Sequence, residues 1–310
     1  MEEIAAMVRC PSDKAAMLQI IDQAFRPRNA SRGVDQLRHL LDTCGIPQCL
    51  SIWERTGLRL LRQAGNMVAP LAYPLARRKI REDALPVIWP SQDQALRESL
   101  RNRLRDGVRV NINRLGEEVL GEEEARRRLV HYMELLTRPE VEVVSVKVST
   151  LFSQITQLAH RYAVAVLADR LERLFEVATE NTFVRPNGER VPKFVYLDME
   201  SYRDLRLTAE AFMMALDRPG MRQVSAGMVL QAYLPEARSL QEEINAWARI
   251  RVLKGGAPIR LRIVKGANLE MEQIEAAHAG WPVTPFTNKV DTDANFKCML
   301  ETAMVTENMA

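Results

Sequence analysis

The sequence is poor in the residues that build metal and disulfide sites. Its 310 residues include four cysteines and four histidines, and neither kind is clustered. No two cysteines form a CxxC pair and no histidines form HExxH, so the pattern predicts free thiols and no zinc site. Stretches of about eighteen apolar residues are also lacking, so no membrane-spanning helix is expected.

An excess of one charge is lacking as well. The 43 Lys and Arg side chains nearly balance 40 Asp and Glu, for a net charge of +3. This balance argues against a nucleic-acid partner, which needs a basic surface. The first residues, Met1-Glu2-Glu3, do not begin a signal-peptide pattern, so a cytoplasmic location is expected.

Two regions with different patterns follow one another along the chain. Residues 1–102 carry apolar positions at helical spacing, such as Leu37, Leu40 and Leu41, which predicts a helical arm. From residue 103 to residue 310, strand patterns and helix patterns alternate. The expected strands are 108–113, 140–149, 194–199, 226–233, 259–265 and 282–286, and the expected helices are 116–136, 159–181, 202–216, 240–253, 270–278 and 293–305.

Six strand-then-helix units in succession predict an α/β fold with a parallel sheet and right-handed crossovers. Two architectures meet this pattern: a doubly wound open sheet and a (β/α)8 barrel of the TIM type. No GxGxxG turn follows any strand, which weakens the dinucleotide-binding open sheet. Six units fall short of the eight that close a barrel, so we expect an incomplete barrel preceded by the helical arm.

The strand expected at 259–265 has an unusual basic face. Arg260 and Arg262 point to one side, and the aliphatic residues Ile259, Leu261 and Ile263 point to the other. Arginines on a covered sheet face are costly unless they meet an anion, so one interpretation is an anion or cofactor site. Gly266, just beyond the strand, would let the backbone approach a ligand closely. The equally open alternative is an edge strand whose basic face is solvated.

The other strands repeat this division into one aliphatic face and one face with polar groups. If the aliphatic faces meet the helices, the polar residues converge at the carboxyl-terminal mouth, where barrel enzymes keep their sites. Each residue alone could be a satisfied core polar group, whereas the set favours a functional site. The converging residues are Asn113, Lys147, Asp198, Gln231 and Arg262.

The charges of this set are informative. Two positive side chains, Lys147 and Arg262, accompany one negative side chain, Asp198, which suits a carboxylate substrate or an anion formed in the reaction. Lys147 could instead form a Schiff base, so a lysine-dependent lyase is the competing reaction class. No Ser/His/Asp or Cys/His constellation appears, which argues against covalent hydrolysis.

Five short blocks in these strands and turns resemble those of a known family. Their order and spacing are similar to those of the proline dehydrogenase domain in the bifunctional proline utilisation A flavoenzymes. The resemblance covers about residues 105–305, and the residues before them resemble the arm of such proteins. The blocks are Asn113–Glu117, Ser145–Ser149, Leu197–Glu200, Val229–Tyr233 and Arg262–Ala267.

The resemblance implies a distorted (β/α)8 barrel that holds FAD and oxidises L-proline to Δ1-pyrroline-5-carboxylate. A hydride would pass to flavin N5, and the electrons then to a quinone at the inner face of the membrane. Catalytic roles would fall to Arg262 near N5, Asp198 beside substrate and flavin, and Lys147 at the proline carboxylate. Gln231 would bond the isoalloxazine edge, and Glu117 would orient basic side chains of the substrate site.

Further cofactor contacts are implied by the same resemblance. The turn residues that would line the flavin and its phosphates are Val264, Lys265, Gly266 and Ala267. Thr287 and Lys289 match the segment that reaches the dinucleotide tail. For these last two residues a solvated loop is the alternative.

The sequence departs from the family in two ways. Asn268 stands where many members have a tyrosine near the flavin site. The chain also ends at Ala310, before the family's last two strands and the final helix that clamps the proline carboxylate. We therefore expect part of a longer enzyme, completed by the missing barrel segment and an aldehyde dehydrogenase domain. The alternative is a truncated, inactive fragment that binds FAD or a partner chain.

Overall fold

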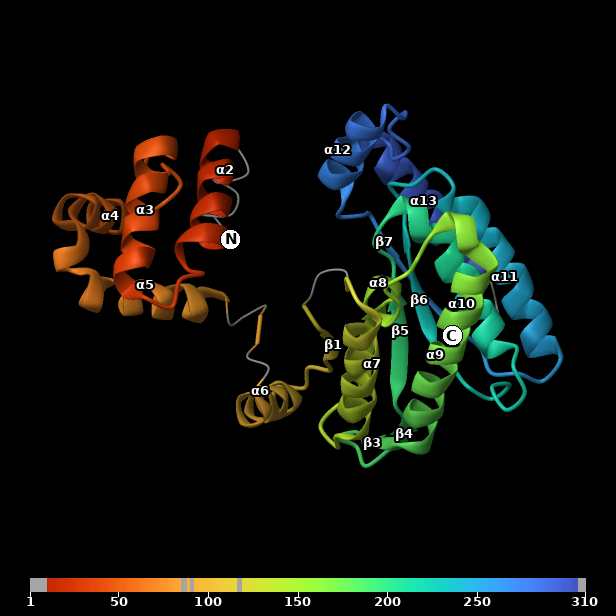
Figure 1. The fold of residues 1–310 in the computed structure, drawn as a ribbon. Coiled ribbons are helices and arrows are strands. Elements are labelled where there is room, and N and C mark those ends of the chain that lie inside the picture. Colours follow the sequence, from red (N-terminus) through yellow and green to blue (C-terminus); the bar gives the residue numbers. More distant parts are fainter. Residues whose placement is uncertain (1–9, 85–87, 90–91, 116–118, 306–310) are drawn as a thin grey trace. The chain divides into compact units, whose positions relative to one another are not determined.

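Figure 1 shows the fold as a computed structural model, which describes residues 10–84, 88–89, 92–115 and 119–305. The chain divides into two compact units, residues 1–96 and residues 97–310. None of the described helices is both long enough and apolar enough to cross a lipid bilayer.

The first unit is helical, as the leucine spacing predicts. α3 (Ala30–Cys44) buries Val34, Leu37 and Leu41, which recur at i, i+3 and i+7 and therefore share one face. The Asn29 side chain caps the start of this helix by accepting a hydrogen bond from the Arg32 N–H. The other elements are α2 (Pro11–Gln19), the π-helical turn Ile20–Ala24, α4 (Ile52–Ala64) and α5 (Ala69–Ala84).

The second unit alternates strands and helices. Its strands are β1 (Asn111–Asn113), β2 (Val143–Lys147), β3 (Thr182–Val184), β4 (Arg190–Pro192), β5 (Phe194–Asp198), β6 (Gly227–Gln231) and β7 (Arg260–Val264). Its helices after α6 (Asp93–Arg105) are α7 (Glu122–Thr137), α8 (Val148–Leu151), α9 (His160–Glu180), α10 (Leu205–Leu216), α11 (Ala237–Leu253), α12 (Leu269–Ala279) and α13 (Lys289–Val305).

Five of these strands form one parallel sheet in the order β1-β2-β5-β6-β7. α7 packs on β2, α9 on β5 and α11 on β6 (Figure 1). The aliphatic residues Val144, Leu197 and Met228 are fully buried. The expected α/β alternation is confirmed. β1 and β7 do not pair with each other, so the barrel is not closed within the described residues.

One expected strand is wrong. Residues 282–286 form no strand, because Pro282 and Pro285 have no N–H to donate to a ladder. The Phe286 N–H donates to the Tyr233 carbonyl at 2.8 Å, which gives this segment one link to the chain just after β6. The antiparallel β3–β4 hairpin was not predicted either, since each of its strands has only three residues.

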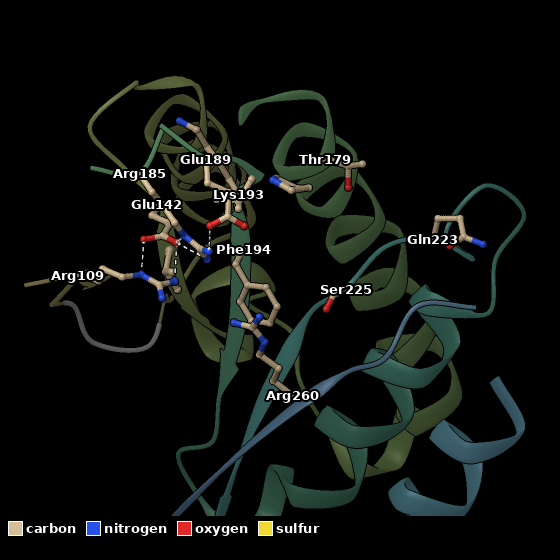
Figure 2. A pocket seen from close by; sticks show the side chains of 13 residues that line it. Arg109, Glu142, Thr179, Arg185, Glu189, Lys193, Phe194, Gln223, Ser225 and Arg260 are labelled. Carbon is tan, nitrogen blue, oxygen red and sulfur yellow. Dashed lines mark hydrogen bonds and ion pairs between the residues drawn. The ribbon is translucent and has the colours of Figure 1, made fainter. Parts of the chain in front are cut away.

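Charged side chains hold the amino-terminal end of the sheet. Glu142, just before β2, is 5% exposed and accepts hydrogen bonds from Arg109 at 2.5 and 2.8 Å. It also accepts from Arg185 at 3.2 Å, and Figure 2 shows both guanidinium groups turned toward it. Arg185 also donates to Glu189 at 2.7 Å. Glu142 thus ties the segment before β1 to the loop of the β3–β4 hairpin.

Glu142→Gln should lower the free energy of unfolding by about 1–3 kcal/mol, because it leaves two arginines without their buried carboxylate. The matched control is Glu189→Gln, whose side chain is 50% exposed in its pair with the same Arg185. That control should change stability by less than about 0.5 kcal/mol. Urea unfolding followed by circular dichroism measures both variants, and equal effects would show that burial of Glu142 is unimportant.

Candidate functional site

A hydrogen-bonded network lies on the polar face of the sheet, centred on Asp198 at the end of β5. One Asp198 oxygen accepts from Arg262 Nη2 at 2.5 Å, and the other accepts from Asn113 Nδ2 at 2.6 Å. Arg262 comes from β7 and Asn113 from β1, so the two edge strands meet a strand from the middle of the sheet. The predicted convergence of these three side chains is therefore observed.

Burial sets the electrostatics of Asp198, which is 7% exposed. This burial raises the pKa of the Asp198 carboxyl, and the nearby charges of Arg262 and Lys147 offset only part of the effect. The Arg262 guanidinium also lies over the Tyr196 ring, 5.4 Å from its centroid. Arg262 is thus fixed by both a carboxylate and an aromatic face.

Lys147, at the end of β2, lies in a second ion pair. Its Nζ is 2.8 Å from Glu200 Oε1, and the other Glu200 oxygen accepts a hydrogen bond from Ser149. The Glu200 backbone carbonyl accepts from Asn268 Nδ2 at 2.9 Å. No role was predicted for Glu200 or Ser149. The available signal was the two-residue spacing between Asp198 and Glu200, which favours the same side of the chain just past the end of β5.

Gln231 ends β6 and is 4% exposed. Its Nε2 donates to the Met199 carbonyl at 3.3 Å, but its buried Oε1 has no hydrogen-bond partner among the described residues. Arg262 Nε is likewise buried without a partner there. Buried polar atoms are usually paired, so these two atoms at the carboxyl-terminal end of the sheet are available to pair with a bound ligand.

The turn after β7 requires a glycine. The Ala232 and Tyr233 N–H groups donate to the Val264 and Lys265 carbonyls, both at 2.7 Å, and extend the β6–β7 ladder into the turn. Gly266 has φ +121°, and a Cβ there would lie 2.3 Å from Tyr233 Cδ1. Both the backbone conformation and the close approach therefore exclude a larger residue.

Four predicted residues remain. Lys265 lies in the turn after β7, and Thr287 and Lys289 lie at or just before the start of α13. Lys265 and Lys289 both form ion pairs with Asp293, and their hydrogen bonds lower the pKa of the Asp293 carboxyl to about 2. Thr287 is exposed. Glu117 lies outside the described residues. The two lysines share a carboxylate, whereas Thr287 has the exposure that the solvated-loop alternative expects.

The two arginines of the basic strand have different surroundings. β7 is an edge strand of the described sheet, and Arg260 is exposed, with its guanidinium 4.8 Å from the centroid of the Phe194 ring. The solvated-face interpretation therefore describes Arg260. Arg262 instead forms an ion pair with the buried Asp198 carboxylate of the chain itself, and its part in an anion or cofactor site stays a prediction.

A pocket of about 270 Å³ lies at the opposite, amino-terminal end of the sheet (Figure 2). Its wall includes Arg109, Glu142, Lys193 and Arg260, and none of the predicted site residues lines it. Burial lowers the pKa of Lys193 in this wall to about 8. Barrel enzymes keep their chemistry at the carboxyl-terminal end of the strands, so the candidate site is the Asp198 network. Within the described residues, no group of three His, Cys, Asp or Glu side chains could hold a metal ion.

Solved structures resemble this chain over most of its length. Proline utilisation A (PutA) from Corynebacterium freiburgense is 35% identical with a TM-score of 0.67, over 74% of this chain and 23% of that protein. PutA from Bdellovibrio bacteriovorus, inactivated by N-propargylglycine, is 26% identical with a TM-score of 0.68, over 98% of this chain and 30% of that protein. PutA from Bradyrhizobium japonicum, at 19% identity and a TM-score of 0.64, shares the fold over 98% of this chain and 31% of that protein.

The chain thus spans less than a third of the length of these relatives. A comparison with curated proteins gives no match. A profile of the family described as proline dehydrogenase matches residues 96–310, which include every residue of the Asp198 network. This family match and the 35% identity to a PutA protein over 74% of the present chain show that the chain belongs to the proline dehydrogenase family, as a domain of the PutA type.

Proposed function

We propose that this chain supplies the catalytic barrel of an enzyme that oxidises L-proline to Δ1-pyrroline-5-carboxylate with FAD as the oxidant. The observation that carries the proposal is the buried Asp198 carboxylate, which pairs with Arg262 and lies opposite Lys147 of the neighbouring strand, at the carboxyl-terminal end of a parallel sheet. Family membership supports the reaction, because the matching family is named for it.

The residues of the site fit a flavin. Gln231 Oε1 is a buried acceptor without a partner among the described residues, which suits the N–H edge of an isoalloxazine ring. Gly266 packs its backbone against the Tyr233 ring, and this turn, with Val264, Lys265 and Ala267, would line the flavin and its phosphates. Lys289 adds positive charge for the diphosphate, with Thr287 nearby in the chain. When bound, FAD would accept the hydride at N5.

The chain's own residues would orient proline and stabilise charge. Formation of the product removes a hydride from the ring CH2 next to the nitrogen, on the side away from the carboxylate. A proton leaves the nitrogen. Lys147 would bind the proline carboxylate through its ammonium group. Arg262, fixed by Asp198, would place a guanidinium where negative charge builds up as the hydride leaves proline. Glu117 would orient basic side chains of the substrate site.

The lysine-dependent lyase is disfavoured by the contacts of Lys147. A Schiff-base lysine must be free to attack a carbonyl carbon, whereas Lys147 Nζ is held 2.8 Å from the Glu200 carboxylate. The alternative of an inactive fragment that binds FAD or a partner chain is favoured by the two unpaired sheet edges, β1 and β7, in the described residues. Open edges accept further strands, which the missing barrel segment of a longer chain would also provide.

The electron acceptor and the cellular location follow from the same proposal. The electrons would pass to a quinone in the membrane. The enzyme would therefore work in the cytoplasm, at the inner face of the membrane. An aldehyde dehydrogenase domain in the same polypeptide would consume the product. The PutA relatives, each more than three times as long as the matched segment, support a multidomain protein.

Gln231→Ala should weaken FAD binding about tenfold, because it removes the buried acceptor for the ring edge. Titration of the purified 310-residue chain, followed by quenching of flavin fluorescence, gives the FAD Kd. Gln223→Ala, at an exposed amide near the amino-terminal end of the sheet, is the matched control and should leave the Kd unchanged. Equal FAD affinity of the two variants would contradict the proposed role of Gln231.

Lys147→Met should raise the Kd for L-proline about 10- to 100-fold, because it removes the charged donor to the carboxylate. Anaerobic equilibrium dialysis of radiolabelled L-proline against the chain loaded with reduced FAD, which cannot accept a hydride, measures this affinity. Lys254→Met, at an exposed lysine after α11, controls for loss of a positive charge. An unchanged Kd in Lys147→Met would remove the carboxylate-binding role of Lys147.

A further inference from the structure

A lysine at a strand end needs a partner to hold it in one place. The Lys147 side chain has a flexible four-carbon stem and is only 25% exposed, so its ammonium group has lost much of its contact with water. Glu200 Oε1, 2.8 Å away, is the carboxylate oxygen in ion-pair contact with it. Asp198 is less available as the ion-pair partner of Lys147, because its two oxygens already accept hydrogen bonds from Arg262 and Asn113.

Glu200 is itself held by contacts from two elements of the chain. Its second oxygen accepts a hydrogen bond from Ser149, which belongs to the short helix α8 and is 7% exposed. Its backbone carbonyl accepts from Asn268 at the start of α12. Glu200 lies two residues beyond Asp198, just past the end of β5. The carboxylate therefore has little freedom to turn away from Lys147.

The hydrogen-bond count leaves Lys147 able to bind a ligand. An ammonium group carries three N–H donors, and Glu200 Oε1 occupies one of them. Ser149 engages the other Glu200 oxygen, so the carboxylate does not grip Lys147 with both oxygens. Among the described residues, this leaves two donors for the carboxylate of a ligand. Glu200 can therefore fix Lys147 without closing it off.

We propose that Glu200 is the positioning residue for Lys147, and that Ser149 and Asn268 fix Glu200 for this task. The proposal rests on the proposed function, in which Lys147 binds the proline carboxylate. It assigns a role in substrate binding to a residue that does not itself touch the substrate. It also gives Asn268, where many family members have a tyrosine, a specific contact in this chain.

The first test needs no substrate. In the 310-residue chain, labelling by a succinimidyl ester and peptide mass spectrometry report the rate at which the Lys147 amine reacts, relative to the exposed Lys254 in the same digest. Glu200→Gln should raise the Lys147 rate at least about threefold, since the flexible side chain is no longer held against a carboxylate 2.8 Å away. The matched control is Glu243→Gln, whose side chain is 47% exposed in a pair with Arg206. Equal Lys147 rates in the two folded variants would overturn the proposal.

The second test links the pair to substrate. Glu200→Gln should raise the Kd for L-proline about three- to tenfold in the wild-type background. In the Lys147→Met background it should add nothing, because Glu200 acts only through Lys147. An effect of equal size in both backgrounds would show that Glu200 acts by itself and would overturn the positioning role. Thermal unfolding of each variant identifies any loss that comes from a damaged fold.

The two tests separate this inference from the proposed function. If Lys147→Met leaves L-proline affinity unchanged, the carboxylate-binding role of Lys147 fails, and the labelling rates still decide whether Glu200 holds its amine. If Lys147→Met weakens binding while Glu200→Gln changes neither the labelling rate nor the Kd, the proposed function stands and the positioning role of Glu200 is wrong.

Discussion

The buried carboxylate of Asp198 is the group on which the polar face of the sheet depends. A carboxylate in such a place is costly to desolvate and persists only when it is paired and hydrogen-bonded. Asp198 meets this requirement with Arg262 on one oxygen and Asn113 on the other. Since these partners come from β7 and β1, one charged group connects the middle of the sheet to both of its edges. The same contacts fix the arginine that the proposed chemistry needs.

The distribution of helices distinguishes the two architectures that the sequence left open. A doubly wound sheet has helices on both faces, so both faces of its strands are apolar. Here the aliphatic residues Val144 and Leu197 are fully buried, whereas the opposite face carries the Asp198 network. Helices α7, α9 and α11 pack on successive strands of the sheet (Figure 1). In a barrel, each strand turns one face to the surrounding helices and the other to the interior. The sheet described here has this arrangement, with one face covered by helices and one face of paired polar groups.

Alternation along a strand made the centre of the site predictable from the sequence. Asn113, Asp198 and Arg262 could be placed together because period-two patterning and parallel pairing fix their face and end. The strand expected at 282–286 does not form, because its prolines have no N–H to donate to a ladder, although its apolar residues suit a strand. The ion pair between Lys147 and Glu200 was not predicted, because a long side chain can reach partners on several elements. Glu200 also lies just past the end of β5, where strand alternation no longer fixes the direction of a side chain. The carboxylate that Lys265 and Lys289 share, Asp293, depends likewise on where α13 begins.

Asn268 connects two segments at the candidate site. Its Nδ2 donates to the Glu200 carbonyl at 2.9 Å. That bond joins the start of α12 to the segment just past the end of β5, on the same short stretch that carries Asp198 and Glu200. Because Glu200 in turn contacts Lys147, the start of α12 is connected through two contacts to the lysine at the end of β2.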